Sequence, residues 1–269
     1  MPNQSDREAI LREIAKKKVV YHPAALDAVR VRRDLTYQST CGANLLMDVY
    51  YPPDVRGPVP VVVIPLGYPD PDAGVRRYGP FTSWAGLIAA SGMAAVLYGS
   101  TAPADDVHAL LRHVRERADS LELAIDRIGI FAGSGNVAVA LSALMRDRQL
   151  TCAALLCGYT MDLDGSSSVA DASREAGFVD ACAGRSPDDL PDDVPMLFVR
   201  AGRDRFAGLN EALDTVVVRA LARNLPIALI NHATGDHGFD LDEDSDTSRG
   251  IVRQILTFLC VHLGAALPS

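Results

Sequence analysis

One serine stands between two glycines at a point where an apolar run gives way to a helical pattern. Residues 127–138 have the sequence Arg-Ile-Gly-Ile-Phe-Ala-Gly-Ser-Gly-Asn-Val-Ala, and this serine is Ser134. A strand that turns at once into a helix leaves its turn residue exposed at the edge of a sheet. A serine hydroxyl in that place can attack a carbonyl carbon when a neighbouring base takes its proton.

Suitable partners follow the last two of six apolar runs in the chain. Asp204 follows the fifth run, and His237 lies in the loop after the sixth. In a parallel sheet such residues collect at the carboxyl ends of the strands, close to one another. We therefore expect Ser134 to attack, His237 to move the proton and Asp204 to orient the imidazole. His232 lies in the same loop, but the glycines near His237 favour the latter as the base.

The elements that must position these side chains are predicted by periodicity. Six continuously apolar runs are typical of central strands covered on both faces; they are 61–64, 93–98, 128–132, 153–157, 196–201 and 227–230. Helical patterns separate and follow them at 81–90, 105–118, 137–145, 209–222 and 251–263. Two alternating runs, Val29–Tyr37 and Leu45–Tyr51, come first and indicate an antiparallel hairpin. The expected fold is α/β, a mostly parallel sheet of about eight strands with an N-terminal antiparallel hairpin, flanked by helices.

Two segments lie outside this alternation. Ser5 with Glu8 forms a capping box and predicts a short helix to about Lys18. The segment 162–193 contains loop-like and acidic, proline-punctuated stretches, and its length predicts a small cap or lid. We expect this insertion to belong to a single domain that covers residues 1–269.

The order of these elements and motifs resembles the α/β-hydrolase fold superfamily, near its esterase/lipase and dienelactone-hydrolase-like branches. The similarity runs from about Asp34 to the C-terminus and includes the order Ser…Asp…His along the chain. Gly202-Arg203-Asp204 and His237-Gly238-Phe239 are similar to the segments that carry the acid and base of that family. The resemblance implies a serine hydrolase that cleaves a small-molecule carboxylic ester, or a related thioester or lactone, through an acyl-enzyme. Such chemistry needs no metal and no organic cofactor.

The chain departs from the family pattern in two places. The turn has Ala-Gly-Ser-Gly-Asn at 132–136 in place of G-x-S-x-G, and Asn136 is larger than glycine, although asparagine tolerates unusual backbone angles. The loop Pro65-Leu66-Gly67-Tyr68 stands where the family has H-G-G-G. An oxyanion hole uses backbone N–H groups, so side-chain changes need not abolish it. We assign its donors as the amides of Gly135 and Tyr68.

Two other functions remain open from the sequence. The letters Gly133-x-Gly135-x-x-Ala138 match a dinucleotide-binding fingerprint, and Asp162 follows the next strand, roughly where a ribose-binding acid would fall. Against this alternative, at least two parallel strands precede the turn, and the placement of the acid and the base would be a coincidence. The second alternative is a catalytically inactive α/β-hydrolase-fold protein that binds a ligand or partner.

Composition excludes several classes. A formal charge of −8 without a basic cluster argues against nucleic-acid binding. The polar start and the absence of a long apolar run predict no signal peptide and no membrane span. The five cysteines are widely spaced and form no C-x-x-C pair, so neither a disulfide framework nor a zinc site is expected, and a reducing, cytoplasmic compartment is. The acids between 236 and 246 lack calcium-loop order and are expected to be solvated. Composition is compatible with a homo-oligomer.

Overall fold

The computed structural model describes residues 12–40, 43–54, 57–70 and 74–265. Within them an eight-stranded sheet has the order β1-β2-β4-β3-β5-β6-β7-β8. The strands are β1 Arg30–Thr40, β2 Ala43–Tyr51, β3 Val59–Ile64, β4 Ala94–Tyr98, β5 Leu123–Gly133, β6 Cys152–Leu156, β7 Met196–Ala201 and β8 Ile227–His232. All six predicted strands and both strands of the hairpin are therefore present. The sequence predicts that the run 227–230 is covered on both faces, but β8 is an edge strand in which Ala228 and Leu229 are exposed.

The sheet changes direction only at its N-terminal side. β1 pairs with β2 in antiparallel register, with Leu35 opposite Met47, and β2 pairs with β4 in the same sense. Every later neighbour is parallel, from the β4–β3 pair to the β7–β8 pair. Parallel strands must be joined by crossovers, which the intervening helices supply. The carboxyl ends of β3 to β8 consequently lie along one edge of the sheet.

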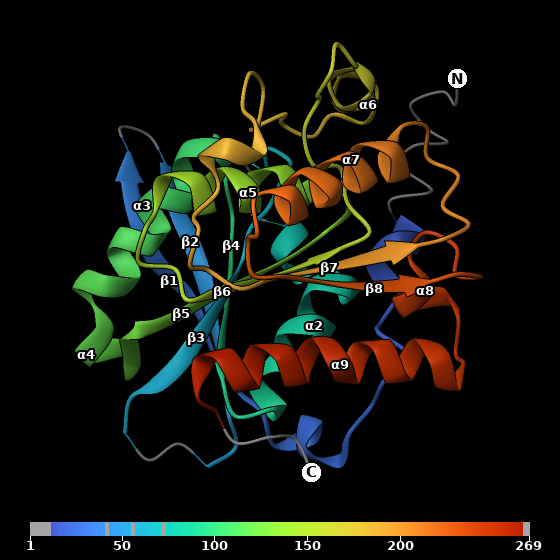
Figure 1. Ribbon diagram of the computed structural model, residues 1–269. Helices are drawn as coiled ribbons and strands as arrows, with labels where there is room; N and C mark the ends of the chain where they lie inside the picture. The colour runs from blue at the N-terminus through green and yellow to red at the C-terminus, as the bar shows by residue number, and fades with distance from the viewer. Residues whose placement is uncertain (1–11, 41–42, 55–56, 71–73, 266–269) are drawn as a thin grey trace.

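Helices cover both faces of this sheet (Figure 1). They are α2 Gly79–Ala90, α3 Pro103–Glu116, α4 Ala118–Leu121, α5 Val137–Arg146, α6 Ser168–Ala176, α7 Leu209–Ala222, α8 Phe239–Asp242 and α9 Asp246–Leu263. Short 3₁₀ helices are η1 Ala24–Ala28, η2 Val75–Arg77, η3 Ser134–Asn136 and η4 Pro187–Asp189. The helical patterns predicted from the sequence correspond to α2, α3, α5, α7 and α9.

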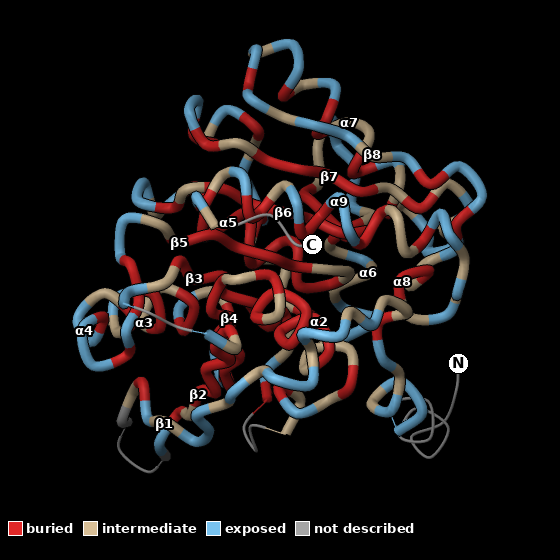
Figure 2. Tube along the Cα trace, turned by 90° about the horizontal axis from the view of Figure 1, so that it is seen from below, coloured by how far each residue is buried: buried red, intermediate tan, exposed pale blue. Residues whose placement is uncertain are grey.

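The sheet separates two apolar cores. α3, α5 and α7 bury apolar side chains on one face, together with Val61, Ile130 and Phe198 from the strands. α2 and α9 bury theirs on the other face, together with Val62 and Phe131. Figure 2 shows the buried residues running along the strands, with exposed residues on the outer loops. Alternate side chains of each central strand thus enter opposite cores, which explains why these strands are apolar throughout.

Some element boundaries differ from the sequence prediction. β5 begins at Leu123 rather than at Ile128, because its early residues Asp126 and Arg127 are exposed or half-buried and interrupt the apolar run. The N-terminal helical residues are 12–16, so this helix ends two residues before the predicted Lys18. The proposed capping box at Ser5 and Glu8 lies outside the described residues.

The segment 162–193 carries α6 and η4 and lies between β6 and β7. In Figure 1 α6 stands beside α7 at the top of the molecule, away from the sheet. Its residue Val169 packs with Leu209 and Ala212 of α7, in a small apolar cluster separate from the two main cores. This placement suits the predicted cap, whose role stays a prediction.

Candidate active site

The turn at Ser134 is tightly built. β5 ends at Gly133 and α5 begins at Val137, with only η3 between them. Ser134 has a φ of +55°, in the left-handed region that non-glycine residues seldom adopt outside turns and functional sites. A Cβ added at Gly158 would lie 2.2 Å from Val137 Cγ2 and 2.6 Å from the Ser134 carbonyl oxygen. The turn is therefore packed against neighbouring backbone, as expected for a strand that passes directly into a helix.

Ser134, His237 and Asp204 lie in one hydrogen-bonded line. Ser134 Oγ is 3.0 Å from His237 Nε2, and His237 Nδ1 is 2.6 Å from Asp204 Oδ2. The serine and the carboxylate therefore engage opposite nitrogens of the same ring. Three side chains separated by 33 and 70 positions in the sequence come together at the carboxyl edge of the sheet.

Asp204 is held rigidly behind the imidazole. Its side chain has no exposed surface, and its Oδ1 accepts a hydrogen bond from the Phe206 amide at 3.0 Å. The Phe206 ring in turn packs edge-on against the His237 ring, with centroids 4.6 Å apart. A buried carboxylate whose two oxygens are both engaged fixes the orientation of the ring and stabilises a positive charge on it. The arrangement can thus accept a proton from Ser134 at Nε2.

A buried acid, Asp240, connects the loop that carries His237 to the core. Asp240 is 6% exposed, and its Oδ2 accepts a hydrogen bond of 2.8 Å from Trp84 Nε1. Burial raises the pKa of the Asp240 carboxyl. The sequence prediction of a solvated acid is wrong for Asp240, because α8 turns this side chain into the core. Trp84 packs against Phe131, with ring centroids 4.2 Å apart, and belongs to the same apolar core as α2 and α9.

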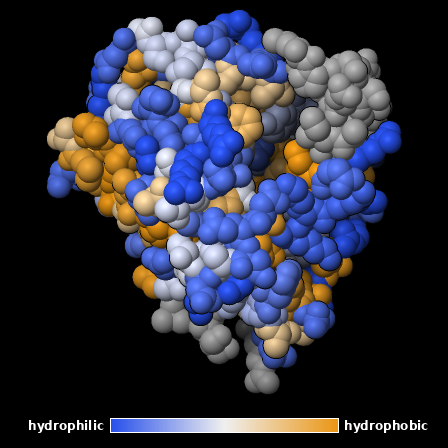
Figure 3. Space-filling model, turned by 90° about the vertical axis from the view of Figure 1, so that its right-hand side faces the viewer, coloured by the Kyte–Doolittle hydropathy of each residue, from blue (hydrophilic) through white to orange (hydrophobic). Residues whose placement is uncertain are grey.

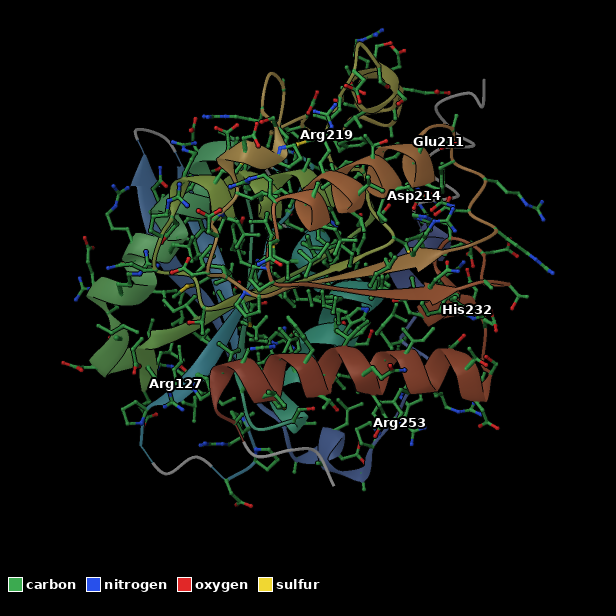
Figure 4. All side chains as sticks on the ribbon, viewed as in Figure 1. Arg127, Glu211, Asp214, Arg219, His232 and Arg253 are labelled. Carbon is green, nitrogen blue, oxygen red and sulfur yellow. The ribbon has the colours of Figure 1, made fainter. Side chains whose placement is uncertain are left out.

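His232 does not face Ser134. This histidine ends β8 and is 3% exposed (Figure 4). Its Nε2 lies 3.3 Å from Glu243 Oε1, and its ring contacts Phe239. Of the two histidines weighed from the sequence, the structure therefore brings His237 to the serine.

Gly135 and Tyr68, the residues predicted to form the oxyanion hole, are neighbours in space. A Cβ added at Gly67 would lie 2.2 Å from the Gly135 carbonyl oxygen, so the loop after β3 packs directly on the turn. A Cβ added at Gly135 would lie 2.7 Å from the Tyr68 hydroxyl. Burial raises the pKa of that phenol. The role of the two amides as oxyanion donors stays a prediction.

Aromatic side chains wall the site on the side of the 162–193 segment. Phe178 stacks on Tyr159 with ring centroids 5.2 Å apart and meets Tyr68 edge-on at 6.2 Å. The Val179 amide donates to the Gly67 carbonyl oxygen at 2.8 Å, which ties this segment to the loop after β3. Phe178 and Tyr159 could not be selected from the sequence, because neither belongs to a recognisable motif.

A shallow opening of about 370 Å³ lies at the mouth of the site, lined by Arg205, Phe206, Asp236 and His237. The carboxyl ends of β7 and β8 point to the right in Figure 1. Figure 3 shows that side of the molecule as mostly hydrophilic, with smaller hydrophobic areas between. Phe206 is 56% exposed, so an apolar surface is available beside the imidazole.

The acid of the dinucleotide alternative is already engaged. Asp162 Oδ1 and Oδ2 accept hydrogen bonds of 2.9 Å from the Val169 and Ala170 amides, at the start of α6. β3 and β4, which precede the turn in the chain, are parallel neighbours in the same sheet. A ribose would therefore have to compete with the N-terminus of α6 for this carboxylate.

Metal-binding groups, membrane-spanning helices and cysteines complete the description of residues 12–40, 43–54, 57–70 and 74–265. Within them no group of His, Cys, Asp and Glu side chains has the arrangement of a metal site, and no helix has the length and apolarity to cross a membrane. Four cysteines, at 152, 157, 182 and 260, are free and buried. Cys41 lies outside the described residues.

No protein-family model matches the sequence, and no curated protein matches it either. Solved structures do match over nearly the whole chain. A bacterial heroin esterase aligns with 97% of this chain and 90% of its own, at a TM-score of 0.71 and 15% identity. A thermostable esterase from Pseudomonas putida aligns with 97% and 91%, at a TM-score of 0.71 and 18% identity. Brefeldin A esterase, a bacterial homologue of human hormone-sensitive lipase, aligns with 97% and 84%, at a TM-score of 0.72 and 16% identity.

The chain thus has the α/β-hydrolase fold, as the resemblance implied. The solved structures named above are bacterial esterases of that fold.

Proposed function

We propose that this protein is a serine hydrolase that cleaves a carboxylic ester of a small molecule. The observation that carries the proposal is the line from Ser134 Oγ through the His237 ring to the buried Asp204 carboxylate, at 3.0 and 2.6 Å. The likeness to esterase structures supports the same class. Thioesters and lactones are open to the same residues, because they present the same electrophilic carbonyl carbon.

The geometry supports a two-step acyl transfer. His237 Nε2 takes the Ser134 proton as Oγ bonds to the carbonyl carbon, and the carbonyl oxygen becomes an oxyanion. The amides of Gly135 and Tyr68 stabilise that oxyanion. The C–O bond to the alcohol then breaks, and His237 returns the proton to the departing oxygen. Water, deprotonated by His237, repeats the addition on the acyl-enzyme and releases the acid and the free serine.

The surroundings of the site complete the proposal. The segment 162–193 is a cap within a single catalytic domain, and its Phe178 bounds the space beside Gly135. The opening next to Phe206 admits the ester from solvent. We further propose a cytoplasmic location, because the five cysteines are odd in number and widely spaced, as is typical of a reducing compartment.

A fluorophosphonate probe tests the proposal. The wild type should be labelled at Ser134 and should hydrolyse p-nitrophenyl acetate, whereas Ser134→Ala should do neither. Ser167→Ala is the matched control, because Ser167 is exposed and hydrogen-bonds to a carboxylate, Asp171, but to no imidazole. Absence of both labelling and turnover in the wild type would favour a binding protein. Saturable enhancement of NADH fluorescence would instead support the dinucleotide alternative.

A further inference from the structure

Asn136, the residue that departs from the family turn, uses both ends of its side-chain amide. Its Nδ2 donates to the Gly133 carbonyl oxygen at 2.8 Å, and its Oδ1 accepts from the Gly67 amide at 2.7 Å. The residue is 7% exposed. One side chain therefore joins the end of β5 to the loop that follows β3.

This join lies where two chain segments already touch. The Cβ that Gly67 lacks would fall 2.2 Å from the Gly135 carbonyl oxygen and 3.0 Å from Asn136 Cα. Gly67 precedes Tyr68, and Gly135 precedes Asn136. The hydrogen bond between Asn136 and Gly67 therefore joins the two residues that are adjacent in sequence to Gly135 and Tyr68, whose amides are proposed to hold the oxyanion.

We propose that Asn136 is a positioning residue that fixes the spacing between the Gly135 and Tyr68 amides. This inference rests on the proposed function and adds a residue to its machinery. A glycine at 136 allows the tight turn but supplies no bond to the loop after β3. In this chain the asparagine therefore holds the loop in place, in addition to fitting the turn.

The proposal requires one donor and one acceptor on a side chain of this size. A neutral amide provides both. An ionised aspartate keeps the acceptor for the Gly67 amide but turns a second acceptor toward the Gly133 carbonyl oxygen. A protonated aspartic acid restores the donor. Asn136→Asp should therefore approach wild-type behaviour as the pH falls and the carboxyl protonates.

The experiment compares Asn136→Gly, Asn136→Asp and the wild type in the full chain. We expect Asn136→Gly to lower kcat for p-nitrophenyl acetate by about 10- to 100-fold with KM changed by less than about threefold, because displaced donors weaken only the transition state. The ratio of Asn136→Asp to wild-type kcat should rise as the pH falls from 8 to about 6, because burial at this 7%-exposed position raises the pKa of the introduced carboxyl above its usual value of about 3.9. Amide exchange at Gly67, followed by NMR, should accelerate about tenfold in Asn136→Gly.

Ser91→Ala serves as the matched control. It removes a buried hydrogen bond of 2.8 Å to the Leu87 carbonyl oxygen, at the far end of α2. Its melting temperature should fall while kcat stays at the wild-type value. An Asn136→Gly enzyme with wild-type kcat and unchanged Gly67 exchange would overturn the proposal. If the wild type hydrolyses no ester, faster amide exchange at Gly67 in Asn136→Gly still supports the positioning of this loop by Asn136, whereas unchanged exchange rejects it.

Discussion

Replacing Asp204 with asparagine tests the proposed proton path with almost no change in shape. The wild-type carboxylate accepts from His237 Nδ1 at 2.6 Å and from the Phe206 amide at 3.0 Å. An asparagine that keeps the Phe206 bond must turn its NH₂ group toward Nδ1. That nitrogen then has to accept, so the ring proton moves to Nε2 and points at Ser134 Oγ. The imidazole can no longer take the serine proton.

The other orientation of the asparagine is also unfavourable. With the amide oxygen on Nδ1, the NH₂ group would face the Phe206 N–H, donor against donor, with no solvent at this fully buried side chain. Leaving a buried donor unpaired costs about 1–3 kcal/mol. We therefore expect the wrong tautomer to predominate and kcat to fall about 10⁴-fold, the effect of losing the correct tautomer in a Ser-His-Asp triad. That loss corresponds to about 5.4 kcal/mol in the activation barrier.

The assay is p-nitrophenyl acetate hydrolysis under saturating substrate, with the rate of fluorophosphonate labelling as a second readout. Asp236→Asn is the control, because Asp236 adjoins His237 and carries the same charge but is 63% exposed and 3.9 Å from Arg205. Its kcat should stay within about threefold of the wild type. An Asp204→Asn enzyme that retains a tenth or more of the wild-type kcat would refute the tautomer argument.

Three further outcomes follow from the packing. Asp240→Asn keeps an oxygen acceptor for the hydrogen bond from Trp84 but removes the titratable carboxyl. Because burial raises the pKa of Asp240 in the folded state, the free energy of unfolding of the wild type, relative to that of the variant, should decline as the pH rises above about 4. Urea unfolding of both proteins over a pH series measures this difference. Asp48→Ala should lower the free energy of unfolding in urea by about 1–3 kcal/mol, since the buried Arg76 guanidinium, 2.5 Å from Asp48, then keeps only the half-exposed Asp34 as its partner. Phe178→Ala should cost about 3–5 kcal/mol of stability and raise kcat/KM for bulky acyl esters relative to acetate, measured over a series of p-nitrophenyl esters; an unchanged preference would mean that Phe178 does not bound the acyl site.

The sequence by itself determined the strands and the order of the candidate residues. Runs such as Val61–Ile64 have no polar residue because both faces of their strand are buried. A continuous apolar run is a local feature, so it can be recognised directly in the sequence. The topology then follows, since strand–helix alternation permits few arrangements. Ser134, Asp204 and His237 could be chosen because each follows a strand of a parallel sheet, and such positions converge at one edge.

Only the tertiary structure decided how the site is held together. The hydrogen bond from the Gly67 amide to Asn136 joins residues 69 positions apart, and that from Trp84 to Asp240 joins residues 156 apart. Hydropathy does not distinguish a buried, partnered acid such as Asp240 from a solvated one, because the difference lies in what a distant segment places beside it. The role of Phe178 could not be predicted from the sequence for the same reason, because the rings that it contacts belong to Tyr68 and Tyr159. Local patterns fix elements, whereas the partners of a polar or aromatic side chain are fixed by the packing of segments far apart in the chain.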